Sequence, residues 1–99
     1  MLNITKNTNA SELTVSLTGR LDTVTAPELE KELKASLDGV SALTIDMAAL
    51  EYISSAGLRV LLSAQKTMNK QGEMKVVHVG DTIMEIFEVT GFSDILTIE

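Results

Sequence analysis

The sequence predicts an α/β fold, because segments typical of strands alternate with segments typical of helices along one short chain. Near the amino terminus, apolar and polar residues alternate as in a half-buried strand hairpin. Further on, strand-like runs are separated by apolar residues at helical spacing. Strands joined through helices run parallel with right-handed crossovers. We therefore expect a mixed, mostly parallel sheet of four to five strands, with an N-terminal hairpin and about three helices.

The hairpin is predicted from residues 2–18. Val15 and Leu17 alternate with Thr and Ser neighbours, which indicates a strand, and residues 2–6 indicate a weaker strand before it. The polar segment "NTNAS", residues 7–11, is expected to form the turn between them.

The start of the first helix is predicted at Thr25. Thr25 and Glu28 have the spacing of a capping box, and Pro27 stands in the first turn, where its fixed backbone suits a helix. Val24 is expected to pack against Leu29 as a hydrophobic staple. Leucines 29, 33 and 37 then form one apolar face, and Gly39 is expected to stop the helix.

Two further strands and two further helices are expected downstream. Residues 42–47 and 74–79 are predicted strands, and a helix between them should run from about Ser55 to the "KQG" at 70–72. The buried side of this helix should contain Leu58, Leu61, Leu62 and Met68. The third helix should begin at Asp81 or Thr82, the latter paired with Glu85 in a capping box, and close at Gly91. Its inner side should consist of Ile83, Ile86, Phe87 and Thr90.

Composition narrows the possible functions. The 99 residues are expected to form a single domain, residues 1–99, since no linker divides them. Lys and Arg total 8 against 14 Asp and Glu, so the net charge of −6 argues against a nucleic-acid partner. The chain has no cysteine and no apolar run that could insert into a membrane, so we expect a cytoplasmic protein.

The junction before the second helix carries two adjacent hydroxyls, Ser54 and Ser55. It follows a strand, and in open α/β sheets ligands and partners bind at the carboxyl ends of strands. Ser55 is expected to be the cap of the helix, where the peptide dipoles favour added negative charge. From position alone, two interpretations stay open: the serines are only cap and turn, or they belong to a binding site.

Enzyme, metal and cofactor sites are weakly supported. A nucleophilic serine needs a base, yet the G-x-S-x-G elbow is missing and His78, the single histidine, falls at an expected strand position. The six glycines form no phosphate-binding loop, and Asp22 and Asp46 alone are a weak metal signal. We expect neither enzymatic activity nor a cofactor.

Two segments, "LTGRLDTVTAPEL" and "LTIDMAALEYISSAGLRVLL", resemble the STAS domain family, and specifically its stand-alone members, the bacterial anti-sigma factor antagonists. The similarity extends through "GEMKVVHVGDTIMEIFEVTGFSDIL". It implies a STAS-type fold and a phosphorylatable switch. The family's phosphoacceptor falls on Ser55. Ser54 replaces a common aspartate and is the competing acceptor, and Arg59 replaces a common second glycine.

The resemblance also implies partners. The unphosphorylated form would bind an anti-sigma factor serine kinase and so free a sigma factor, phosphorylation would release the kinase, and a PP2C-type phosphatase would reset the cycle. ATP would belong to the kinase. Asp22 matches a position near the serine, and Asp46 an acidic position at the end of the preceding strand. The implied partner-binding residues are Asp22, Thr23, Asp46, Ser54, Ser55, Ala56, Gly57, Leu58 and Arg59.

Two alternatives keep the same fold. The chain could be the STAS subunit of a lipid ABC transporter, which would bind its ATPase without a phosphate cycle, or a small-molecule-binding domain.

Overall fold

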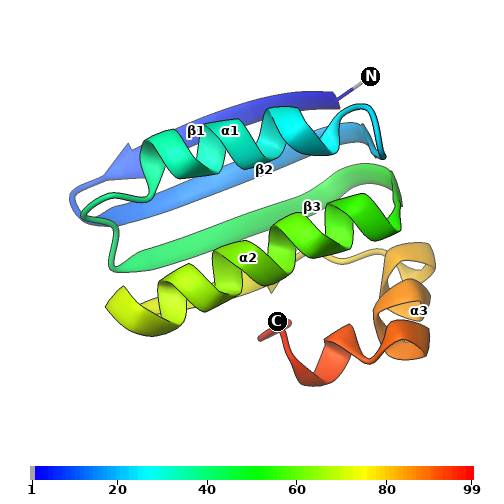
Figure 1. The fold of residues 1–99 in the computed structure, drawn as a ribbon. Helices are drawn as coiled ribbons and strands as arrows, with labels where there is room; N and C mark the ends of the chain where they lie inside the picture. Colours follow the sequence, from blue (N-terminus) through cyan, green and yellow to red (C-terminus); the bar gives the residue numbers. More distant parts are fainter. Residues whose placement is uncertain (1) are drawn as a thin grey trace.

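A computed structural model describes residues 2–99 and shows a four-stranded mixed sheet with two long helices across one face (Figure 1). The strand order is β1-β2-β3-β4, with β1 antiparallel to β2 and the other neighbours parallel. The predicted α/β fold with an opening hairpin is confirmed. The elements are β1 (Leu2–Asn9), β2 (Glu12–Leu21), α1 (Ala26–Ser36), β3 (Ala42–Ile53), α2 (Ser55–Gln71), β4 (Glu73–Val77), α3 (Asp81–Thr90) and the 3-10 helix η1 (Phe92–Asp94).

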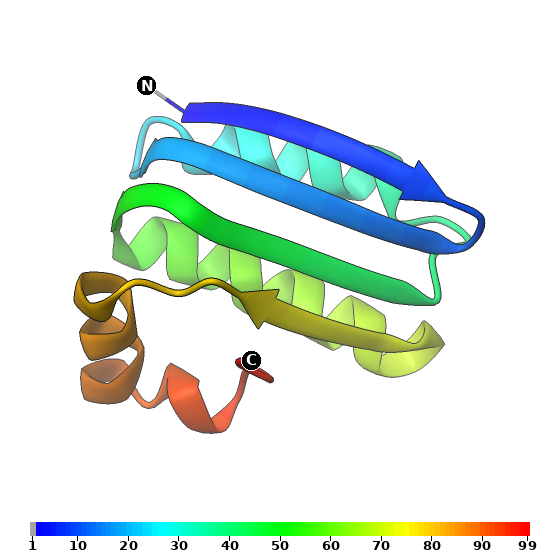
Figure 2. The ribbon, with the colours of Figure 1, turned by 180° about the vertical axis from the view of Figure 1, so that it is seen from behind.

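The hydrophobic core lies between the sheet and the helices α1 and α2. Alternate residues of β2, including Leu13, Val15 and Leu17, are buried under the helices, as the period-two pattern predicted. The leucines of the expected apolar face, Leu29 and Leu33, are buried from the α1 side. The opposite face of the sheet is not covered by α1 or α2 (Figure 2). This open face carries the intervening polar side chains of the strands.

The hairpin turn is tighter than predicted. Asn7, Thr8 and Asn9 were expected in the turn, but they continue β1 and pair in register with β2. Only Ala10 and Ser11 lie between the strands, and Ala10 adopts a positive φ of 56°. The main-chain ladder therefore extends through a polar, exposed stretch that has no hydrophobic signal for a strand.

Helix α1 begins near the predicted residue, but Thr25 does not cap it in the predicted way. Thr25 makes no side-chain capping bond to α1, so the predicted capping box is wrong. Its buried hydroxyl instead accepts from the Asp22 N–H at 2.8 Å and donates to the Arg20 carbonyl at 2.9 Å. Val24 is 80% exposed, so the predicted staple to Leu29 is also wrong. Pro27 does lie in the first turn, as expected.

The third helix differs from its prediction in its start and its inner side. Gly80 precedes α3 with no side-chain capping bond, so the capping box of Thr82 and Glu85 is wrong. Ile83 and Phe87 are buried as predicted, whereas Thr90 is exposed and donates to the Ile86 carbonyl at 2.7 Å.

The chain turns away from the sheet earlier than expected after β4. This strand ends at Val77, and His78 lies beyond it with a positive φ of 57°, so its predicted strand position is wrong. The last segment adds only a bridge between Val76 and Ile98. Within residues 2–99 the sheet therefore has four strands, the lower of the two numbers expected.

Candidate functional site

The two serines lie where the parallel strands β2 and β3 end. Leu21, the last residue of β2, pairs with Ile53, the last residue of β3. The Ser54 N–H donates to the Leu21 carbonyl at 2.9 Å, which ties the serine junction to the loop that begins at Asp22. The carboxyl ends of two neighbouring strands thus bring both loops together.

The two serine hydroxyls have different roles. Ser54, not Ser55, is the N-cap of α2: its backbone is extended and its Oγ accepts from the Gly57 N–H at 3.4 Å. The predicted capping role of Ser55 is therefore wrong by one residue, because the chain enters the helix only after Ser54. Ser55 is the first helical residue and is exposed, and within residues 2–99 its hydroxyl makes no hydrogen bond. The fold uses one hydroxyl and leaves the other for solvent or a partner.

Asp22 organises the loop beside the serines. Its Oδ1 accepts from the main-chain N–H groups of Val24 and Thr25, both at 3.0 Å. The Thr25 N–H is the largest influence that holds the pKa of the Asp22 carboxyl below its ordinary value; desolvation opposes it, and the Thr25 side chain, the Val24 N–H and Arg20 reinforce it. Asp22 therefore presents a stable negative charge next to the serine junction.

Asp46 does not reach the serine loop. The predicted strand ended near this residue, but β3 continues to Ile53 through two register shifts. Asp46 pairs with Ser16 of β2, and the five residue steps from Ser16 to Leu21 correspond to about 16 Å of strand. The prediction that Asp46 stands at the end of its strand is thus wrong.

Asp46 instead forms a small polar group with His78. Its Oδ1 accepts from the Ala48 N–H at 2.9 Å and lies 3.1 Å from His78 Nδ1. The Ala48 hydrogen bond is the largest influence lowering the pKa of the Asp46 carboxyl, and His78 acts in the same direction against desolvation. Because His78 contacts Asp46 at mid-strand, it does not serve the serine loop as a base.

Gly57 lets α2 start directly against the strand ends. A Cβ at this position would lie 2.7 Å from Leu21 Cγ and 2.9 Å from Ile53 Cγ1. Leu58 is 6% exposed and anchors the same turn in the core. Of the expected partner-binding residues, Gly57 and Leu58 therefore support the loop from inside, while Thr23, Ser55 and Arg59 are exposed.

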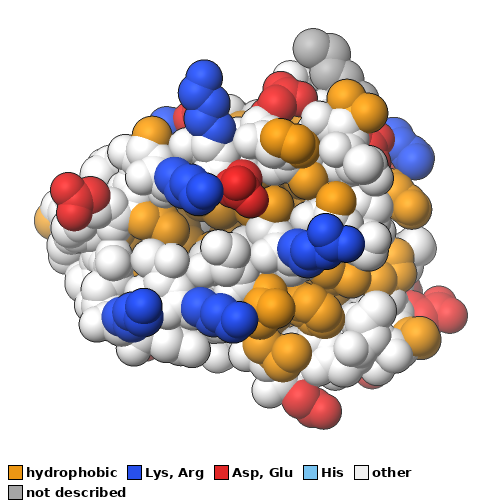
Figure 3. All heavy atoms as spheres, viewed as in Figure 1, with side chains coloured by type: hydrophobic (Ala, Val, Ile, Leu, Met, Phe, Trp, Pro, Cys, Tyr) orange, Lys and Arg blue, Asp and Glu red, His pale blue; other side chains and the backbone are white. Residues whose placement is uncertain are grey.

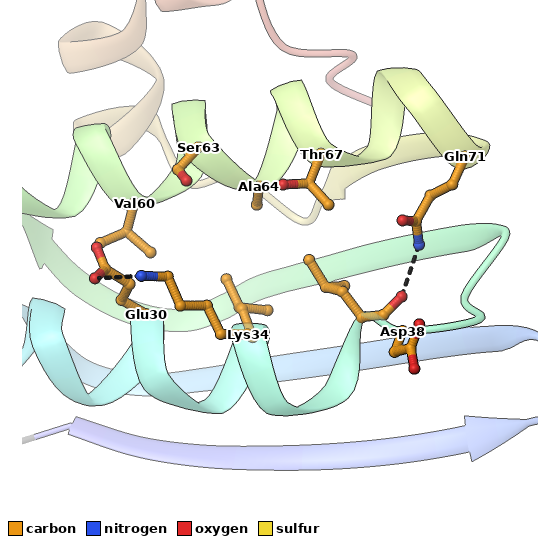
Figure 4. Close-up of a pocket in the computed structure, with 10 residues that line it drawn as sticks. Glu30, Lys34, Asp38, Val60, Ser63, Ala64, Thr67 and Gln71 are labelled. Atoms are coloured by element: carbon orange, nitrogen blue, oxygen red, sulfur yellow. Dashed lines mark hydrogen bonds and ion pairs between the residues drawn. The ribbon is translucent and has the colours of Figure 1, made fainter.

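A groove between α1 and α2 leads away from this loop. The part of the groove next to the loop has a volume of about 180 Å³ and is lined by Thr23, Ala56 and Arg59 among others. A larger hollow of about 290 Å³ continues along the helices and shares Glu30 and Val60 with the first. Figure 4 shows its α2 side chains directed toward α1. Sequence reasoning missed this groove, since the separation of two helices leaves no signature in either one.

The aromatic residue before the serines was also missed as a surface feature. The Arg20 guanidinium lies 4.4 Å from the centre of the Tyr52 ring, and Tyr52 is 36% exposed. Arg20 and Tyr52 pair across β2 and β3 one residue before the strand ends. The cation–π contact thus joins β2 and β3 next to the loop.

Metal and membrane features are lacking in the described part of the chain. Residues 2–99 contain no group of three or more His, Asp or Glu side chains arranged to hold a metal ion. Among the helices of that range, none combines the length and apolarity required to cross a bilayer.

Known proteins resemble this chain over nearly its whole length. BtrV of Bordetella bronchiseptica is 38% identical over 88 residues, which cover 87% of this chain and 76% of BtrV. The anti-sigma-B factor antagonist of Staphylococcus aureus (strain NCTC 8325 / PS 47) is 32% identical over 97 residues, covering 96% and 90% of the two chains.

A solved structure agrees closely in fold. The crystal structure of an anti-sigma factor antagonist from Mycobacterium paratuberculosis superimposes with a TM-score of 0.89 at 28% identity and covers 99% of this chain and 85% of its own. The STAS domain family matches residues 2–99. With sequence, topology and family match in agreement, the chain belongs to the STAS domain family.

Proposed function

We propose that this protein is an anti-sigma factor antagonist whose unphosphorylated form binds an anti-sigma factor serine kinase through the loops at the ends of β2 and β3. Relatives that match nearly the whole chain have the name of such antagonists. The protein acts by binding and is not an enzyme.

One observation carries the assignment of the switch to Ser55. The cap of α2 is supplied by Ser54, so the neighbouring exposed hydroxyl of Ser55 has no structural task within residues 2–99. A kinase can reach it without unfolding the loop. Ser54, the competing acceptor, is half-buried and would lose its capping bond on modification. We therefore assign the phosphate to Ser55.

A phosphate on Ser55 would act on the partner more than on the fold. It adds about −1.5 to −2 charge at pH 7 and would stand at the N-terminus of α2, where main-chain N–H groups and the helix dipole favour an anion. The helix should therefore persist. The ionised Asp22 beside the loop adds to the negative charge, and burying that charge against the kinase costs binding energy. The kinase is released, and a PP2C-type phosphatase restores the binding form.

The experiment that tests this proposal maps the phosphate. The purified protein is incubated with its cognate anti-sigma factor and Mg-ATP, and the tryptic peptide from Ala35 to Arg59 is analysed by mass spectrometry in the wild type, Ser55→Ala and Ser54→Ala. We expect one phosphate in the wild type and in Ser54→Ala, and none in Ser55→Ala. A phosphate that persists in Ser55→Ala and vanishes in Ser54→Ala would show that Ser54 is the acceptor and that the assignment to Ser55 is wrong. An unmodified wild type would remove the phosphate cycle and favour the transporter-subunit alternative.

A further inference from the structure

Helix α2 differs in charge from the rest of the chain. It contains three basic residues, Arg59, Lys66 and Lys70, and no Asp or Glu. The whole chain has a net charge of −6, so α2 contributes +3 and the remainder contributes −9. Helix α2 thus carries three of the eight basic residues, and among the helices of residues 2–99 it alone has no acidic residue to offset them.

These three residues form a line that starts at the proposed phosphoacceptor. At 100° per residue, Ser55, Arg59, Lys66 and Lys70 lie within about 40° of one direction on the α2 surface. All four are exposed, and the line is about 22 Å long at 1.5 Å per residue. We call this line the α2 stripe. Figure 3 shows Lys and Arg side chains along α2 on the helical face of the molecule.

The cations of the α2 stripe are not neutralised within the chain. Lys6, Lys34 and Lys75 each form an ion pair with a glutamate, at 2.6, 3.3 and 3.8 Å. In contrast, Arg59, Lys66 and Lys70 take part in none of the ion pairs found among residues 2–99, and the same holds for Lys31 of α1, which stands apart from the stripe. Their charge is available to a partner, and none of them supports the fold through an ion pair.

The groove between α1 and α2 runs beside the stripe. Val60 and Ala64 line it from α2, and Leu33 of α1 and the following Leu37 line it from the other side (Figure 4). Gln71 spans its far end by donating to the Leu37 carbonyl at 2.6 Å. The groove is also lined by Glu30, Lys34 and Asp38, so a partner segment would place its apolar side chains in the groove and its acidic side chains on the stripe. Three cations on a chain with a net charge of −6 suit nucleic acid far less.

We propose that the α2 stripe, with its adjoining groove, is a docking surface for an acidic segment of the anti-sigma factor, and that a phosphate on Ser55 weakens the docking by cancelling the charge of the stripe. This inference rests on the proposed function. A phosphate of about −1.5 to −2 offsets about half to two-thirds of the +3 of α2. Arg59 lies four residues after Ser55, one helical turn away, and is the cation nearest in sequence to the phosphate. The phosphate thus acts as an electrostatic competitor of the acidic segment.

The test compares two variants of equal net charge with the wild type. Lys66→Gln/Lys70→Gln removes two charges from the far end of the stripe, and Lys31→Glu makes the same change in net charge at an exposed position on α1. Association with the anti-sigma factor is followed by surface plasmon resonance between about 50 and 300 mM salt. Circular dichroism checks that all three proteins melt alike.

We expect Lys66→Gln/Lys70→Gln to bind about five- to tenfold more weakly than the wild type at low salt, mainly through a slower on-rate and with a smaller salt dependence. Lys31→Glu should stay within about twofold. Equal losses of affinity in the two variants, or no loss in either, would show that the α2 stripe is not the docking surface, while leaving the proposed function intact. A wild type that does not bind the anti-sigma factor overturns both. If stripe-dependent binding is instead found with phosphatidylserine vesicles or duplex DNA and not with the anti-sigma factor, the occupant is wrong.

Discussion

Replacing Gly57 by alanine tests how the strand ends position the serine loop. The added Cβ would lie 2.7 Å from Leu21 Cγ and 2.9 Å from Ile53 Cγ1, closer than real Cβ contacts allow. Leu21 is 0% exposed and Ile53 is 2% exposed, so neither has room to withdraw. Overpacking of this kind costs about 1–3 kcal/mol, and alanine regains up to about 1 kcal/mol through its higher helix propensity. The free energy of unfolding should therefore fall by about 1–2 kcal/mol.

Thermal and urea unfolding measure this loss. For a domain of this size we expect a decrease in Tm of about 4–12 °C. Gly80→Ala is the control for steric overpacking, because nothing lies within 4 Å of the Cβ it would add; since alanine is a poorer N-cap than glycine, its free energy of unfolding should fall by less than about 1 kcal/mol. If Gly57→Ala is as stable as Gly80→Ala, then α2 does not start against the strand ends as described, and the placement of Ser55 fails with it.

Further predictions concern the side chains of the two loops. Ser54→Ala removes the N-cap of α2 and should lower the free energy of unfolding by about 0.5–1 kcal/mol, whereas Ser55→Ala should change it by less than about 0.5 kcal/mol. Urea unfolding of both variants measures the two changes. A larger loss in Ser55→Ala than in Ser54→Ala would contradict the division of roles between the two hydroxyls. Asp22→Asn should make stability less dependent on pH: the folded pKa of Asp22 is lowered, so its contribution is present above the unfolded pKa near 3.9 and is lost as the pH falls through the folded pKa. Melting curves from pH 7 to pH 2 check this, and an unchanged acid limb in Asp22→Asn would show that the loop hydrogen bonds do not favour the carboxylate.

Much of the fold is predictable from local pattern. The alternation at Val15 and Leu17, the leucines of α1 spaced four residues apart and the stop at Gly91 each have a direct physical cause in the residue types themselves. These signals were sufficient for the α/β class and the hairpin. They were insufficient where tertiary contacts decide. Thr25 has the spacing of a cap, yet its hydroxyl is used by the Asp22 loop.

The candidate site was predicted in outline, and its details depended on the exact ends of the elements. The extra length of β3 moves Asp46 about 16 Å from the strand ends, and a shift of one residue transfers the cap from Ser55 to Ser54. Neither the bulges nor the groove between α1 and α2 has a marker in the sequence. The charge of α2 was readable from its residues alone, but its alignment with Ser55 and the groove required the fold.

A phosphate on Ser55 is expected to release the anti-sigma factor. Titration calorimetry with the unmodified and the stoichiometrically phosphorylated protein, at the same ionic strength, tests it most directly. We predict that phosphorylation raises the Kd at least tenfold, a loss of about 1.4 kcal/mol or more in binding free energy, with an unchanged far-ultraviolet circular dichroism spectrum. Equal Kd values for the two forms would show that the phosphate does not control binding.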